Sequence, residues 1–189
     1  MSETENACFF YGTLMSFKVL SRVIYRTTDP DPWLFQDLQI KEAILHGYCR
    51  HQVRFADYPG IIAEAGKSVK GMYVTGLRDM EIRRLDTFEG DEYTREVVTA
   101  RLLNPDGTEG EDVQCSAYVY RDESNLIKEE WDFDAFVAEK LHRWVGASKE
   151  YDEVDQIDPT GGRQWMTVAS IGARKVVEVA VQDELKAAV

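Results

Sequence analysis

The sequence predicts a single α+β domain, and three observations support this prediction. Extended segments of apolar and aromatic residues outnumber helical ones, and a hairpin signal joins two of them. One stretch around residue 140 instead repeats its apolar side chains at helical spacing. The chain has 189 residues, 44% of them hydrophobic, and no linker rich in Pro, Ser or Gly divides its middle. One substantial core is therefore expected.

The N-terminal part predicts a strand, a turn and a helix. Residues 7–11 are apolar and aromatic, which is typical of a buried strand. Gly12 and Thr13 form a turn, and residues 16–25 predict a helix. The sequence Asp-Pro-Asp-Pro at 29–32 predicts a loop, because proline and the residue before it both resist helix.

The middle of the chain predicts four strands and a short helix. The strands are expected at residues 40–48, 51–55, 61–65 and 69–75, with a turn at Tyr58-Pro59-Gly60 between the second and the third. Residues 79–87 predict a helix. Its apolar side chains are expected to face the core, and three polar ones to face solvent: Glu81, Arg83 and Arg84.

The clearest hairpin lies in the second half. Residues 93–103 and 112–120 alternate as strands do, and Asn104-Pro105-Asp106-Gly107 between them has turn chemistry. Residues 132–145 predict a helix with Asp132 as its N-cap.

Composition excludes some classes of function. A net charge of −12 argues against a nucleic-acid or anionic-membrane partner, because both need clustered Lys and Arg. No apolar run is long enough to span a bilayer, and the acidic, polar first residues do not resemble a targeting peptide. The three widely spaced cysteines, Cys8, Cys49 and Cys115, are typical of reduced thiols. The cytoplasm is the expected compartment.

Two motifs are candidates for chemistry. In residues 9–15, Phe-Phe-Tyr-Gly-Thr-Leu-Met, a strand runs into a glycine turn, whose backbone N–H groups can bind an anion such as a carboxylate. In residues 85–93, Leu-Asp-Thr-Phe-Glu-Gly-Asp-Glu-Tyr, Glu89 follows an aromatic residue, and partial desolvation there would raise its pKa toward that of a general acid/base. The residues alone leave two alternatives open: a turn that simply ends a strand, and an exposed loop carboxylate like its acidic neighbours.

Together these motifs resemble the gamma-glutamylcyclotransferase-like superfamily, in the branch of AIG2-like proteins and gamma-glutamylamine cyclotransferases. The family pattern Leu-Asp-x-Phe-Glu-Gly-x-x-Tyr matches residues 85–93 throughout. The resemblance implies a mixed or antiparallel sheet curled into a small barrel with flanking helices. It also implies that Glu89 is the catalytic acid/base and that Tyr11, Gly12, Thr13 and Leu14 hold the glutamyl part of a small-molecule gamma-glutamyl substrate. The implied products are 5-oxoproline and a free amine, and no cofactor is required.

Four further residues are candidates for substrate contact. Tyr93 begins a strand four residues after Glu89, so its hydroxyl could bond the substrate or Glu89, although a half-buried strand tyrosine is an equal alternative. Tyr118 and Tyr120 share a face of the returning strand. Arg50 could contact a carboxylate, although solvated arginines are commoner.

Metal binding is not expected from the sequence. His46, Cys49 and His51 have suitable side chains, but their spacing along a strand divides them between two faces, and no second ligand pair follows. The nucleophile elbow, the P-loop and the dinucleotide fingerprint are all absent from the sequence.

The resemblance covers residues 7–145, which we expect to form the cyclotransferase-like domain. Residues 146–189 are a C-terminal extension, expected to pack on the same domain as part of a monomer or weak homodimer. Because a fold does not establish a function, two alternatives stay open. One is a non-catalytic small-molecule-binding or regulatory module, and the other is an altered amide-lyase reaction.

Overall fold

The structure, a computed structural model, describes residues 6–146 and 149–158. Contacts divide the chain into Met1–Ile157 and Asp158–Val189. All the helices and strands described below belong to the first of these units. Within the described residues, no helix is both long and apolar enough to cross a membrane.

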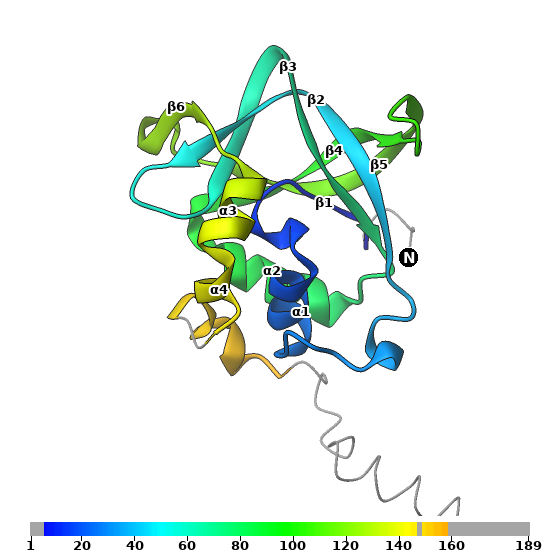
Figure 1. The fold of residues 1–189 in the computed structure, drawn as a ribbon, viewed down its shortest axis with the longest axis vertical. Helices are drawn as coiled ribbons and strands as arrows, with labels where there is room; N and C mark the ends of the chain where they lie inside the picture. The colour runs from blue at the N-terminus through cyan, green and yellow to red at the C-terminus, as the bar shows by residue number, and fades with distance from the viewer. Residues whose placement is uncertain (1–5, 147–148, 159–189) are drawn as a thin grey trace, which may run out of the picture. The chain divides into compact units, whose positions relative to one another are not determined.

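The strands close into a barrel. β1 pairs with β3 antiparallel and with β5 parallel, β2 pairs with β3 and β4, and β4 pairs with β5, so five strands form a ring. The last strand, β6, adds to one end of β2 (Figure 1). The predicted α+β class with a mixed sheet curled into a barrel is confirmed. The strands are β1 Cys8–Phe10, β2 Gln39–Val53, β3 Pro59–Thr75, β4 Tyr93–Leu103, β5 Glu109–Tyr120 and β6 Leu126–Glu130.

Two long strands replace the four predicted in the middle of the chain. β2 runs through the break expected after residue 48, and β3 through the one expected after residue 65. Their pairing shifts register between His46 and Tyr48. Gly47 and Gly66 adopt positive φ angles of 78° and 80° there, so the ladder takes up a bulge without ending. The strand breaks predicted after residues 48 and 65 are therefore wrong, and β6 was not predicted.

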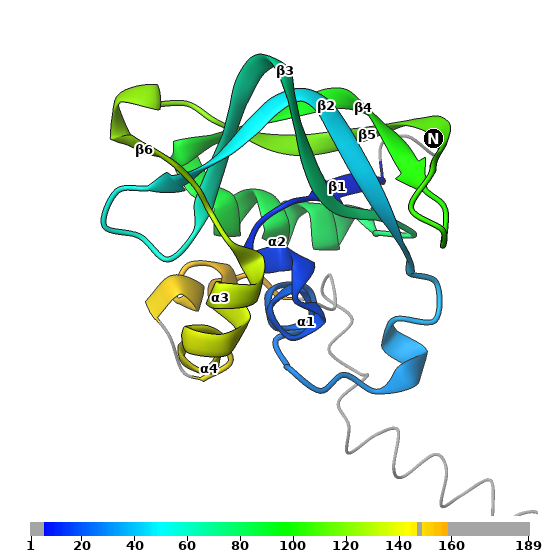
Figure 2. The ribbon, with the colours of Figure 1, turned by 45° about the horizontal axis from the view of Figure 1, so that its top comes forward.

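The helices gather on one side of the barrel, where α1 and α2 pack together (Figure 2). The predicted helix 132–145 is divided at Lys140, whose φ of −122° is not helical. Asp132 does cap its start, accepting a hydrogen bond from the Ala135 N–H at 2.9 Å. The helices are α1 Phe17–Tyr25, α2 Asp79–Glu89, α3 Phe133–Glu139 and α4 Leu141–Trp144.

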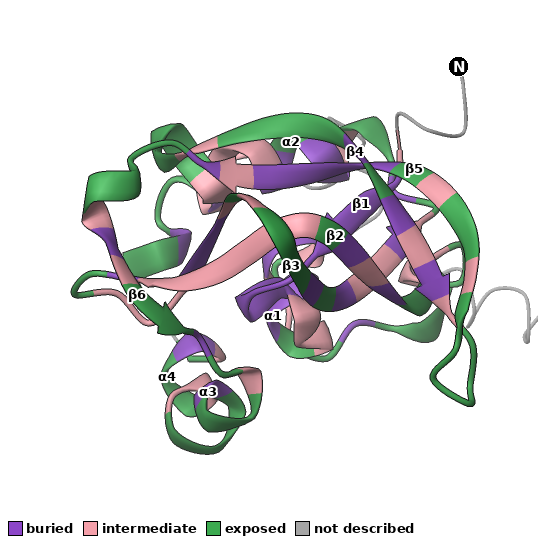
Figure 3. Cartoon of the chain, turned by 90° about the horizontal axis from the view of Figure 1, so that it is seen from above, coloured by how far each residue is buried: buried purple, intermediate pink, exposed green. Residues whose placement is uncertain are grey.

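Two large buried cores result, one inside the barrel and one between the barrel and the helices, and a third, small cluster joins Val53, Tyr120 and Leu126. Figure 3 colours the chain by burial. Because successive side chains of a strand point to opposite faces, β1 serves both. Phe9 packs inside the barrel, and Phe10 packs toward α1 and α2.

Arg84 and Glu81 are buried, which corrects the prediction that they face solvent. The Arg84 guanidinium donates to the carbonyl of Val23 at 2.6 Å, to that of Val154 at 2.8 Å and also to that of Ile157. It therefore ties residues 149–157 to the helical side of the domain, where Tyr151 and Val154 are buried. This part of the predicted extension packs on the domain, and residues 159–189 lie outside the described residues.

Candidate active site

The two sequence motifs meet at one cavity of about 100 Å³. The end of β1 and the turn after it form one wall, and the end of α2 and the start of β4 form another. Helix α4 and the loop before β3 complete the rim. The lining residues are Phe9, Phe10, Tyr11, Gly12, Thr13, Leu14, Tyr58, Pro59, Phe88, Glu89, Glu92, Tyr93, Tyr118, Trp144 and Glu150.

Glu89 is the last residue of α2, two residues beyond the predicted helix end. Gly90 follows with a φ of 64°, which ends the helix and leaves the Glu89 side chain at the cavity. Burial raises the pKa of its carboxyl group to about 8, and the negative charges of Glu92 and Asp86 act in the same direction. Among the described residues, we find no hydrogen bond that would compensate the ionised form.

The turn after β1 presents free backbone donors to the cavity. The N–H groups of Gly12, Thr13 and Leu14 take part in none of the backbone hydrogen bonds found among the described residues. Gly12 has a φ of −118°, so a left-handed backbone conformation is not the reason that glycine is needed at this position. A Cβ atom at this position would instead lie 2.9 and 3.0 Å from the ring atoms of Pro59. Close packing between the turn and β3 therefore demands glycine.

Three tyrosines form fixed walls. Tyr11 donates its hydroxyl hydrogen bond to the Tyr118 carbonyl at 2.6 Å, and Tyr93 donates to the Pro59 carbonyl at 2.8 Å. Tyr118 donates to the Asp86 carboxylate at 2.9 Å. The Tyr93 hydroxyl thus bonds the backbone and not Glu89. All three rings line the cavity.

The structure keeps two of the predicted substrate-contact residues out of the lining. Arg50 donates to the Tyr11 carbonyl at 2.8 Å, and its guanidinium lies 5.4 Å from the ring centre of Trp131. Its guanidinium therefore contacts the backbone of the turn, and Arg50 is not among the residues that line the cavity. Tyr120 packs edge-on against Tyr93, with ring centres 5.1 Å apart. Arg50 and Tyr120 thus each contact a residue that lines the cavity and are not part of the lining themselves.

Several cavity residues were missed by the sequence reasoning. Glu92 is exposed, as expected, but it also lines the cavity and accepts a hydrogen bond from the Tyr58 hydroxyl at 2.8 Å. Trp144 comes from α4 and contacts Tyr58 and Phe88 edge-on, at 6.2 and 6.3 Å between ring centres. Glu92 could have been suspected from its place inside the second motif. Nothing local distinguishes Tyr58 or Trp144, because tertiary packing alone brings them here.

A family model described as "Gamma-glutamyl cyclotransferase, AIG2-like" matches residues 8–134, which is most of the barrel and both motifs. The chain belongs to this family. Its similar relatives include Protein AIG2 C of Arabidopsis thaliana, 28% identical over 163 residues that cover 86% of this chain and 90% of the relative. AIG2-like protein C of the same plant is 27% identical and covers 77% of each chain.

Solved structures support the same fold. A solution structure of an A. thaliana protein is 26% identical, has a TM-score of 0.51 and covers 73% of this chain and 83% of its own. A second A. thaliana solution structure is 22% identical, with a TM-score of 0.53 and coverage of 90% and 93%. The latter identity is low enough that it shows the fold alone.

Proposed function

We propose that this AIG2-like chain is a gamma-glutamyl cyclotransferase-type enzyme, which converts a gamma-glutamyl amide to 5-oxoproline and a free amine. One observation carries the proposal. Glu89, the glutamate of the family pattern, lies in a cavity walled by aromatic rings, and its pKa of about 8 suits proton transfer near neutral pH.

The reaction matches the few groups present. The substrate's own α-amine attacks its γ-carbonyl carbon, so the nucleophile is already tethered and the enzyme need not supply one. The new C–N bond closes a five-membered ring, and the bond to the leaving amine breaks. Glu89 accepts a proton from the α-ammonium group and then donates it to the leaving nitrogen, so it returns to its starting state. The ring nitrogen loses a second proton as it becomes an amide, and the departing amine carries that proton away as an ammonium ion.

The turn residues Gly12, Thr13 and Leu14 would bind the negative end of the substrate. Their unused N–H groups can donate to the α-carboxylate or to the oxyanion that develops on the γ-carbonyl oxygen. Tyr11, Tyr93 and Tyr118 would shape the pocket with their rings, because their hydroxyl groups already bond protein acceptors. The reaction as written consumes no cofactor.

The test is release of 5-oxoproline by purified protein from gamma-glutamyl amino acids, gamma-glutamyl amines, gamma-glutamyl-ε-lysine and glutathione. Glu89→Gln should lose activity by a factor of ~10²–10⁴, as expected for a missing general acid/base. Asp91→Asn is the matched control, because its exposed side chain is not part of the lining. Turnover of one class, lost in Glu89→Gln and kept in Asp91→Asn, supports the proposal. A folded protein that releases no 5-oxoproline from any of them refutes it.

A further inference from the structure

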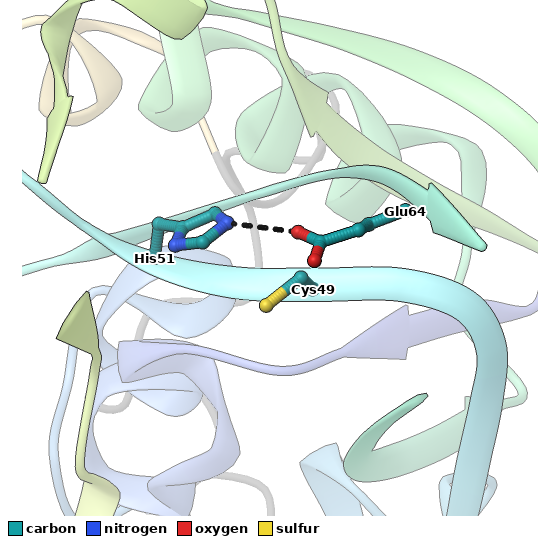
Figure 4. Close-up of side chains that lie close together, drawn as sticks. All are labelled: Cys49, His51 and Glu64. Atoms are coloured by element: carbon teal, nitrogen blue, oxygen red, sulfur yellow. Dashed lines mark ion pairs between the residues drawn. The ribbon is translucent and has the colours of Figure 1, made fainter. Parts of the chain in front are cut away.

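A second cluster of reactive side chains lies outside the cavity, on the paired strands β2 and β3. Cys49 pairs with Ile62 and His51 with Gly60 across the two strands. Since alternate residues of a strand share a face, Cys49 and His51 project on one side, and Glu64 joins them from β3. Figure 4 shows His51 and Glu64 pointing toward one another, with Cys49 beside them. Their sulfur, nitrogen and oxygen atoms all lie within 4.8 Å of one another.

We propose that Cys49, His51 and Glu64 bind a Zn²⁺ ion, with water in the remaining position. Tetrahedral zinc has bonds of about 2.0–2.3 Å, which places any two of its ligand atoms roughly 3.3–3.7 Å apart. The Nε2 atom of His51 lies 3.5 Å from a carboxylate oxygen of Glu64. That separation suits two ligands of one ion. The Cys49 sulfur lies within 4.8 Å of a ligand atom of each, so it must move by at most roughly 1 Å to reach the same spacing.

The chemistry of the three ligands also selects the ion. A thiolate and an imidazole favour zinc over magnesium or calcium, which prefer oxygen ligands alone. One thiolate and one carboxylate balance the two positive charges of Zn²⁺. Binding forms a Zn–S bond and releases the thiol proton to solvent.

Burial favours a specific site on this sheet face. The His51 side chain is only 12% exposed, whereas that of Glu64 is 42% exposed and leaves a path for an ion. Among the described residues, Cys49, His51 and Glu64 are the only group of three potential ligand side chains that meets in this way.

This proposal departs from the expectation of no metal, and the reason lies in the strand geometry. His46, considered with Cys49 and His51 in the sequence, is separated from them by the bulge at Gly47, and it contacts Glu109 at 3.1 Å instead. The third ligand comes from the neighbouring strand, so no local motif could reveal it. The Cys-x-His spacing on one strand was the available signal.

The site has no part in the proposed reaction, because none of its three residues lines the cavity. Zinc bound there would link β2 to β3 through their side chains, close to the register shift between His46 and Tyr48. We therefore expect zinc to raise the thermal stability of the protein by binding the folded state only.

The experiment uses the full-length reduced protein, stripped of metal and then titrated with Zn²⁺ against a chromophoric chelator. A parallel titration with Co²⁺ reports the ligands, since a thiolate ligand gives a charge-transfer band in the near ultraviolet. We expect one equivalent to bind with that band. Cys49→Ser should abolish the band and weaken binding at least about tenfold, because loss of even an outer-shell partner costs that much.

His46→Gln is the matched control, because His46 lies on the same strand as Cys49 and His51 but contacts Glu109 of β5 and is not part of the cluster. It should bind as the parent does. Glu64→Gln changes a partly exposed side chain and serves if Cys49→Ser does not fold. The proposal is overturned if no Zn²⁺ binds, if Co²⁺ shows no thiolate band, or if neither Cys49→Ser nor Glu64→Gln weakens binding.

Discussion

Replacing Glu89 with glutamine should stabilise the protein at alkaline pH, whether or not the protein is an enzyme. The carboxyl pKa rises from 4.5 to about 8 on folding, mainly through burial and then through the charges of Glu92 and Asp86. Between these two pH values the folded chain keeps a proton that the unfolded chain releases. The contribution of Glu89 to stability is therefore largest below pH 4.5 and falls as the pH rises toward 8.

The magnitude follows from the size of the shift. Each tenfold change in proton affinity is worth ~1.4 kcal/mol, so a rise from 4.5 to about 8 corresponds to roughly 5 kcal/mol at most. Water in the open cavity screens part of this penalty, and we expect about 2–3 kcal/mol. Glutamine has nearly the same shape and carries no charge, so Glu89→Gln should escape the penalty.

The assay is urea-induced unfolding of the parent protein and Glu89→Gln at pH 5 and pH 9. At pH 5 their unfolding free energies should agree within about 0.5 kcal/mol, and at pH 9 the variant should be more stable by about 2–3 kcal/mol. Asp91→Asn makes the same chemical change at an exposed site and should shift both values equally. Equal stabilities of the parent and Glu89→Gln at pH 9 would refute the reasoning, and with it the raised pKa.

Three further substitutions test the cavity and the helical side of the domain. In the proposed reaction Glu89 acts first as a base, so kcat/KM should rise with pH through about 8; Glu92→Gln removes a charge that raises this pKa and should move that rise to lower pH. If the pH profile of kcat/KM is the same in Glu92→Gln and in the parent protein, this prediction is contradicted. Gly12→Val should lose ~1–3 kcal/mol of stability in urea unfolding, because its side chain meets Pro59, and unchanged stability and KM contradict this. Arg84→Met leaves buried carbonyls unpaired and should cost roughly 2–4 kcal/mol in the same assay; a cost below about 0.5 kcal/mol would show that the contacts are unimportant.

The sequence predicts well where local signals and packing agree. The hairpin of β4 and β5 and the start of α3 follow from alternation, turn chemistry and an N-cap, and all three appear in the structure. The breaks predicted inside β2 and β3 are wrong. Gly47 and Gly66 lie near them, and glycine in a strand often marks a bulge. The closed ring supplies pairing on both sides, so those glycines become bulges instead.

The candidate site was predictable only in part, for a related reason. The turn at Gly12 and the carboxylate Glu89 sit in contiguous motifs, and motif order alone places them in one family. Arg84 illustrates a feature that the sequence does not reveal. A polar residue on a helix face is expected to be solvent-exposed, yet here three backbone carbonyls from other segments accept hydrogen bonds from its guanidinium in the interior. Those carbonyls leave no trace in the local sequence.

The surroundings of Glu89 argue that its position is selected for something other than stability. It ends α2, where the helix dipole disfavours a negative charge, and the last turn of that helix holds no basic residue. Glu92 and Asp86 add like charges, and the cavity walls exclude part of the water. A lysine or arginine at this helix end would serve folding better. Proteins depart from such local rules mainly at functional sites, because a carboxyl group that exchanges protons near neutral pH requires the very environment that destabilises its charge.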